Sequence, residues 1–168
     1  MPFLRNKRAA RLPDPRDPAV TLADVERAIR RLHPVPHLCP ARAEALVAEG
    51  RARLFDVRAE AEFNEGHIPG SIRIDPATTA ARFVADHGEA CAGRVVLFVC
   101  SVGLRSARMA ERAAAALAPF RPLAVANLSG GLFRWEAEGR RPTLPGLHPF
   151  DSAWGALLAR TRRACSRR

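Results

Sequence analysis

Two kinds of hydrophobic pattern divide this chain into strands and helices. Residues 95–99 form a continuous apolar run without polar alternation, which predicts a strand buried on both faces. Shorter apolar segments at 53–57, 72–74 and 123–128 predict further strands. Because helical patterns separate these strands, their order indicates an α/β fold with a parallel, doubly wound sheet. The helices are expected at about 41–49, 78–87 and 106–117, with a short one that contains Leu132, Phe133 and Trp135.

The segment before this alternating region carries one helix of its own. Thr21 has the character of an N-cap, with Asp24 three residues further on. Leu22, Val25 and Ile29 then fall on one helical face, which predicts an amphipathic helix. The first 20 residues are polar and rich in proline, and we expect them to be poorly ordered.

The segment after Pro142 also differs from the centre of the chain. Ser152 is the expected cap of a final helix, with Trp154, Leu157 and Leu158 on one side. Arginines accompany these apolar positions, so the predicted helix is basic.

The net charge of +10 is concentrated at the two ends of the 168-residue chain. Residues 1–40 carry +4, residues 41–140 carry +1 and residues 141–168 carry +5. A nearly neutral centre argues against a nucleic-acid-binding core and leaves the ends as interaction tails. The sequence has no apolar stretch long enough to span a bilayer and no apolar core of a secretory signal, so we expect a cytoplasmic protein.

Cys100 carries the clearest chemical signal. It ends the apolar run 95–99, and a short glycine-containing loop then leads into an alanine-rich helix. This order places the thiol at the carboxyl edge of the sheet, where the sites of open α/β folds lie. Loop N–H groups and a helix N-terminus favour negative charge, and therefore the reactive thiolate.

The remaining cysteines give no comparable signal. Cys39, Cys91 and Cys165 show no paired spacing of the CxxC kind, and reduced thiols are expected. Cys39 forms a loose group with His33 and His37, but a second cysteine pair that would complete a tetrahedral zinc site is missing. We therefore expect no metal and no cofactor.

Three segments resemble the signatures of the rhodanese homology domain family, in the family's order and at reasonable spacing. The similarity covers residues 38–142, so that 1–37 is a basic N-terminal extension with one amphipathic helix and 143–168 a basic C-terminal tail with a helix. The segments are Asp56-Val57-Arg58 with Glu62-Phe63 and Gly66-His67-Ile68-Pro69-Gly70-Ser71, then Cys100-Ser101-Val102-Gly103-Leu104-Arg105-Ser106, and finally Leu128-Ser129-Gly130-Gly131 with Trp135 and Gly139.

The resemblance implies a five-stranded parallel sheet flanked by helices on both faces, with a short first strand near Leu38. It also implies a sulfurtransferase. In that family the cysteine thiolate takes the outer sulfur of a donor such as thiosulfate or a persulfide and becomes a cysteine persulfide. A thiol, cyanide or a partner protein then accepts the sulfur, and two transfers through one covalent intermediate imply ping-pong kinetics.

The site residues follow from the same segments. Cys100 is the expected nucleophile, and Arg105 is the expected cation for an anionic donor or leaving group. Ser101, Val102, Gly103, Leu104 and Ser106 complete the substrate-binding loop, whose backbone N–H groups are expected to surround the charged sulfur. Asp56, Arg58 and Glu62 are interpreted as an ion-pair network that braces the loop, and His67 as a residue that fixes a turn rather than a proton carrier.

Two alternatives differ in chemistry. Phosphatases and arsenate reductases of the same fold carry five residues between cysteine and arginine, whereas four lie between Cys100 and Arg105, which favours sulfur transfer. The second alternative is a sulfur-carrier or binding module with little turnover, which docks a protein partner through the basic flanks. The sequence indicates no specific nucleic-acid partner and leaves the donor, the acceptor and the oligomeric state open.

Overall fold

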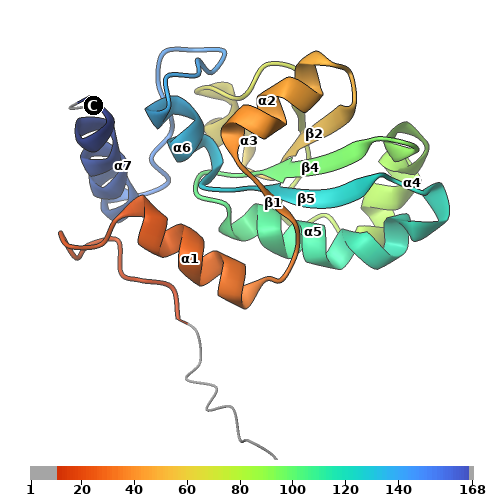
Figure 1. The fold of residues 1–168 in the computed structure, drawn as a ribbon, viewed down its shortest axis with the longest axis horizontal. Helices are drawn as coiled ribbons and strands as arrows, with labels where there is room; N and C mark the ends of the chain where they lie inside the picture. Colours follow the sequence, from red (N-terminus) through yellow and green to blue (C-terminus); the bar gives the residue numbers. More distant parts are fainter. Residues whose placement is uncertain (1–10, 167–168) are drawn as a thin grey trace, which may run out of the picture.

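The computed structural model describes residues 11–166 and has one parallel sheet of five strands in the order β1-β5-β4-β2-β3. This confirms the predicted α/β fold (Figure 1). All five residues of β4 are buried, because the strand lies at the centre of the sheet. The strands are β1 (His37–Leu38), β2 (Ala52–Asp56), β3 (Ile72–Arg73), β4 (Val95–Val99) and β5 (Ala124–Leu128).

Helices cover both faces of this sheet (Figure 1). One face packs on α4 (Ala80–Cys91) and α5 (Leu104–Leu117) and buries Phe55, Val96 and Phe98. The opposite face buries Leu54 and Leu97 against the other main helices. Those helices are α1 (Leu22–Leu32), α2 (Pro40–Ala48), α6 (Gly131–Ala137) and α7 (Ser152–Cys165). The described residues also form the short helix α3 (Glu60–Asn64) and the 3-10 turn η1 (Ala118–Phe120).

Capping residues define the helix boundaries. Thr21 caps α1 as predicted: its hydroxyl accepts from the Asp24 N–H, and the Asp24 carboxylate accepts from the Thr21 N–H at 2.9 Å. The prediction for α7 is wrong by one residue, because Asp151 and not Ser152 is the N-cap. The Asp151 carboxylate accepts from the N–H groups of Ala153 and Trp154 at 2.9 and 3.0 Å.

The two flanking segments share the core of the central sheet. Leu22 and Ile29 of α1, and Leu157 and Leu158 of α7, belong to the same buried cluster as strand residues of β4 and β5. The Arg160 guanidinium also donates to the backbone carbonyls of residues 15, 17 and 20 at 2.9–3.2 Å. Residues 11–20 are therefore held against α7, which differs from the poor order expected there; residues 1–10 lie outside the described chain. None of the described helices has the length and apolarity to cross a membrane.

Candidate active site

The Cys100 thiol lies where β4 ends and α5 begins. The Gly103 N–H donates to the Cys100 Sγ at 3.2 Å, and the Ser106 hydroxyl donates to the same sulfur at 3.3 Å. Gly103 has φ +100, a left-handed conformation that favours glycine. A Cβ there would also lie 3.2 Å from the Leu128 carbonyl oxygen, so the loop needs glycine for two reasons.

The sulfur is buried but borders a cavity. Cys100 is 1% exposed, and several of its neighbours in the core are hydrocarbon side chains. On the other side an open cavity of about 100 Å³ reaches the residue. The described residues that line it are Cys100, Ser101, Val102, Leu104, Arg105, Phe150 and Trp154.

Arg105 is bound by a carboxylate from a distant part of the sequence. Its two terminal nitrogens each donate to one oxygen of Glu62, both at 2.7 Å, and Nη2 also donates to the Ser101 hydroxyl at 3.1 Å. This is the bidentate geometry of a strong, charge-assisted pair. The expected cation is therefore present beside Cys100, with its charge balanced by Glu62.

The Glu62–Arg105 pair changes the titration of both groups. Burial alone raises the pKa of the Glu62 carboxyl, but the hydrogen bonds and the charge of Arg105 outweigh burial and hold that pKa below its ordinary value. Burial alone lowers the pKa of Arg105, whereas the hydrogen bond to Glu62 and the charges of Cys100 and Glu62 raise it above its ordinary value. The pair therefore stays ionised across the neutral range.

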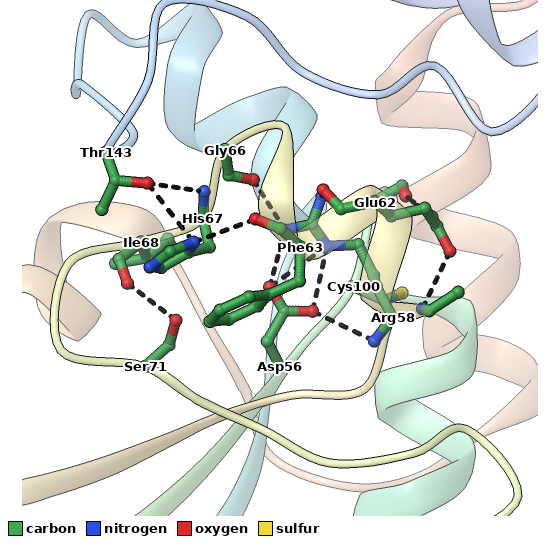
Figure 2. A network of polar contacts seen from close by, with 12 residues as sticks. Asp56, Arg58, Glu62, Phe63, Gly66, His67, Ile68, Ser71, Cys100 and Thr143 are labelled. Carbon is green, nitrogen blue, oxygen red and sulfur yellow. Dashed lines mark hydrogen bonds and ion pairs between the residues drawn. The ribbon is translucent and has the colours of Figure 1, made fainter.

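Arg58 and Asp56 form a second ion pair, which is fully buried (Figure 2). Arg58 donates through Nε and Nη2 to the two oxygens of Asp56 at 2.9 and 2.7 Å, and both side chains are buried. The same guanidinium donates to the backbone carbonyls of Glu62 at 3.1 Å and Gly66 at 2.8 Å. Arg58 thus ties the end of β2 to the middle of α3 and to the turn that follows it, and α3 presents the Glu62 side chain to Arg105. The expected network consists of two ion pairs joined through backbone.

His67 itself contacts the neighbouring Phe63 and the C-terminal segment. Its ring stacks on Phe63 with centroids 3.7 Å apart, and Nδ1 lies 3.0 Å from the Phe63 carbonyl oxygen. The His67 N–H donates to the Thr143 hydroxyl at 3.2 Å (Figure 2). The His67 carbonyl accepts from the Thr143 N–H at 2.8 Å. These contacts hold the turn and attach it to the chain after Pro142.

Sequence reasoning missed two residues of the cavity. Phe150 and Trp154 follow the segment with family resemblance, in a part of the chain that carries no motif. In the sequence, Phe150 and Trp154 are recognisable only as two aromatic residues close to the start of a predicted helix. That signal does not say toward which part of the fold the rings point.

The Cys100 thiol, between a central parallel strand and a helix N-terminus, defines the class of this protein as an α/β protein with a thiol in the loop after its central strand. The model of the Rhodanese-like domain family matches residues 40–138, which is more than half of the chain. The chain belongs to this family. No curated protein sequence matches the chain significantly.

Solved structures agree with this fold. A thiosulfate sulfurtransferase from Pseudomonas aeruginosa is 19% identical with a TM-score of 0.56; the match covers 83% of this chain and 26% of that chain. A protein of unknown function from Rhodopseudomonas palustris, described as a possible tyrosine phosphatase, is 23% identical with a TM-score of 0.50 and coverage of 74% and 95%. A protein from Bacillus halodurans is 21% identical with a TM-score of 0.51 and coverage of 70% and 82%. At these identities the likeness shows the fold alone, and this chain spans about a quarter of the Pseudomonas enzyme.

Proposed function

We propose that the protein is a sulfurtransferase that carries sulfane sulfur on Cys100. The Cys100 thiolate attacks the outer sulfur of a donor, a new S–S bond forms, and the old S–S bond of the donor breaks. The leaving group takes the electron pair, so thiosulfate releases sulfite and a persulfide releases a thiolate. An acceptor thiolate or cyanide then attacks the outer sulfur of the Cys100 persulfide and regenerates the thiolate.

The observation that carries this proposal is the pair of donors on one sulfur. The Gly103 N–H and the Ser106 hydroxyl both point to the Cys100 Sγ, at the N-terminal end of the 14-residue α5. These groups and the helix dipole stabilise negative charge on sulfur without a general base. The adjoining cavity gives room for the transferred sulfur.

Arg105 acts in this proposal as a positioning residue. Its guanidinium ties Ser101 of the loop to Glu62 of α3, so it holds the loop around the sulfur. Because Glu62 already balances its charge, Arg105 contributes less as a free anion-binding group than the sequence alone indicates. The short loop of four residues between Cys100 and Arg105 supports sulfur transfer over phosphoryl transfer.

Mass spectrometry tests the proposal directly. After incubation with thiosulfate and removal of the excess, the intact protein should gain the mass of one sulfur, and dithiothreitol should remove it. Cys100→Ser should abolish the gain, whereas Cys165→Ser and Cys39→Ser, which change exposed thiols, should keep it. Cys91 is a weaker competitor, because burial raises the pKa of its thiol to about 11. A Cys100→Ser protein that still gains one sulfur would disprove the assignment.

The low exposure of Cys100 favours one second candidate, a sulfur carrier that serves a protein partner. In that case small donors react slowly, and sulfur moves quickly to or from a protein that docks at the cavity. Rapid transfer from thiosulfate to cyanide with ping-pong kinetics argues for the enzyme. Poor rates with every small donor, together with fast exchange with a co-purified protein, argue for the carrier.

A further inference from the structure

The segment after the family domain completes the cavity at Cys100. Phe150 and Trp154 line it together with Val102 and Leu104 of the active loop. We infer that Phe150 and Trp154 determine substrate specificity, and that they select sulfur donors with an apolar organic group next to the transferable sulfur over the dianion thiosulfate. This inference rests on the proposed sulfur transfer and names its substrate class.

The segment is fastened to the family domain before it reaches the cavity. Thr143 forms two backbone-anchored hydrogen bonds with His67, one through its N–H and one through its hydroxyl. Three residues later, the Gly146 carbonyl oxygen lies so close to Gly66 that a Cβ on Gly66 would approach it to 2.5 Å. Gly66 is also the residue whose carbonyl Arg58 holds (Figure 2). The segment that carries Phe150 and Trp154 is therefore anchored to the turn at Gly66 and His67. This turn follows α3, whose Glu62 binds Arg105 of the catalytic loop.

Phe150 is held in a strained conformation. Its backbone has φ +70, which non-glycine residues rarely adopt, and its N–H donates to His148 Nδ1 at 3.0 Å. The ring lies 5.0 Å from the guanidinium carbon of Arg105, within cation–π distance, although 53% of the residue is exposed. Backbone strain of this kind concentrates at binding sites, where the surrounding structure enforces it. The strained turn places an exposed aromatic ring at the cavity mouth.

Trp154 belongs to α7 and lines the cavity. The backbone N–H of Trp154 donates to the Asp151 carboxylate that caps α7, and the Trp154 side chain packs against the large core cluster. The Trp154 ring therefore packs on the core and the Phe150 ring lies by Arg105. Together the two rings form a preformed apolar wall of the cavity.

The charges at the cavity disfavour a dianion. Among the described residues that line it, Arg105 is the single cation, and both terminal nitrogens bind Glu62. Thiosulfate would bring two negative charges next to a neutralised ion pair and four apolar side chains. A monoanionic or neutral donor with an apolar substituent avoids this cost and buries its substituent on the rings.

The size of the cavity limits the substituent. Pockets for drug-sized ligands occupy roughly 300–1,000 Å³, whereas an apolar cavity of about 150 Å³ accepts benzene. The cavity at Cys100 measures about 100 Å³ and is open to one side. It therefore suits one ring or a short alkyl group, such as that of an organic thiosulfonate or an organic hydropersulfide.

Two thiosulfonates that share the same reacting group and differ in their organic substituent test the inference. Methanethiosulfonate and benzenethiosulfonate carry the same charge, and with both the Cys100 thiolate takes the outer sulfur while a sulfinate leaves with the electron pair. We expect kcat/KM, normalised to the rate of each donor with free cysteine, to be about tenfold higher for the benzene compound. Phe150→Ala and Trp154→Ala should each lower this ratio toward one. Leu123→Ala, which removes an apolar side chain outside the cavity whose exposure is similar to that of Phe150, should not change this ratio.

Every outcome decides a separate point. A ratio near one in the unchanged protein, or a high ratio that both aromatic variants retain, overturns the inference. If neither donor loads Cys100, the proposed sulfur transfer fails, and binding of the two unreactive sulfinates then decides the inference by calorimetry. Tighter binding of benzenesulfinate that is lost in Phe150→Ala and Trp154→Ala supports an apolar wall, and equal binding of the two sulfinates refutes it.

Discussion

Two arginine–carboxylate pairs belong to the same network but differ in how far solvent reaches them. Arg58 and Asp56 are sealed in the protein, with side chains 1% and 0% exposed. Arg105 and Glu62 are 26% and 5% exposed, and Arg105 borders the cavity. The difference in exposure indicates that the two pairs have different roles.

The sealed pair, Arg58–Asp56, binds the scaffold around α3, whereas we propose that the outer pair, Arg105–Glu62, positions the loop after Cys100. Arg58 uses its remaining donors on the backbone carbonyls of Glu62 and Gly66, so it fixes the shape of α3 and the turn after it. The Nη2 of Arg105, which also binds Glu62, donates to the Ser101 hydroxyl, next to Cys100 in the sequence. Breaking the Arg58–Asp56 pair should lower the free energy of unfolding, and breaking the Arg105–Glu62 pair should mainly lower activity.

Arg58→Ala should give the largest effect on stability. It leaves the Asp56 carboxylate buried without a partner, and removing one member of a buried pair costs about 3–5 kcal/mol. Urea denaturation measures the change as a lower midpoint. Arg82→Ala is the matched control, because it breaks an exposed pair with Asp86 and should change the free energy of unfolding by less than about 1 kcal/mol. Equal costs for the two variants would contradict the scaffold role of Arg58.

Arg105→Lys separates positioning from charge. Lysine keeps the positive charge but loses the planar fork that binds both Glu62 oxygens and Ser101 together. If Arg105 positions the loop, sulfur loading of Cys100 should slow by roughly tenfold or more, since small displacements of reacting groups are costly. The measurement is the rate of persulfide formation by rapid-quench mass spectrometry. A lysine variant with full rate would show that a cation alone suffices.

Local chemistry explains what the sequence predicted correctly. The apolar run 95–99 and the Thr21–Asp24 capping box are short-range patterns, and the structure has both where they were expected. The cap of α7 was assigned to Ser152 although Asp151 precedes it, because aspartate and serine are almost equally good caps and the backbone conformation decides between them.

Long-range contacts explain what the sequence did not reveal. Glu62 and Arg105 lie 43 residues apart, and their direct pairing depends on how α3 faces α5. Phe150 and Trp154 line the cavity at Cys100, and their segment is attached to the domain by the Thr143–His67 contact, which spans 76 residues. Motifs identified the residues that we propose to react, whereas the tertiary packing of a segment without motifs determines what surrounds them.

The smallest expected effect is on the pH dependence of stability, and it belongs to the outer pair. The pKa of Glu62 is lower in the folded protein than its ordinary value, although burial opposes this, because Arg105 and the Ala59 N–H stabilise the carboxylate. A carboxyl whose pKa falls on folding stabilises the protein above its unfolded pKa of about 4.3, and this contribution is lost as the pH falls through the lower folded-state value. Glu62→Gln should therefore be less stable than the unchanged protein near neutral pH.

The difference between the two proteins should shrink as the solution is acidified, because protonation of Glu62 removes the charge that glutamine lacks at every pH. Urea midpoints of both proteins between about pH 7 and pH 3 measure it. Because other carboxyls titrate equally in both proteins, the difference isolates Glu62. A gap between the midpoints that stays constant over this range would mean that the Glu62 carboxylate acts through its shape and not through its charge. The outer pair would then resemble the sealed pair in function as well as in geometry.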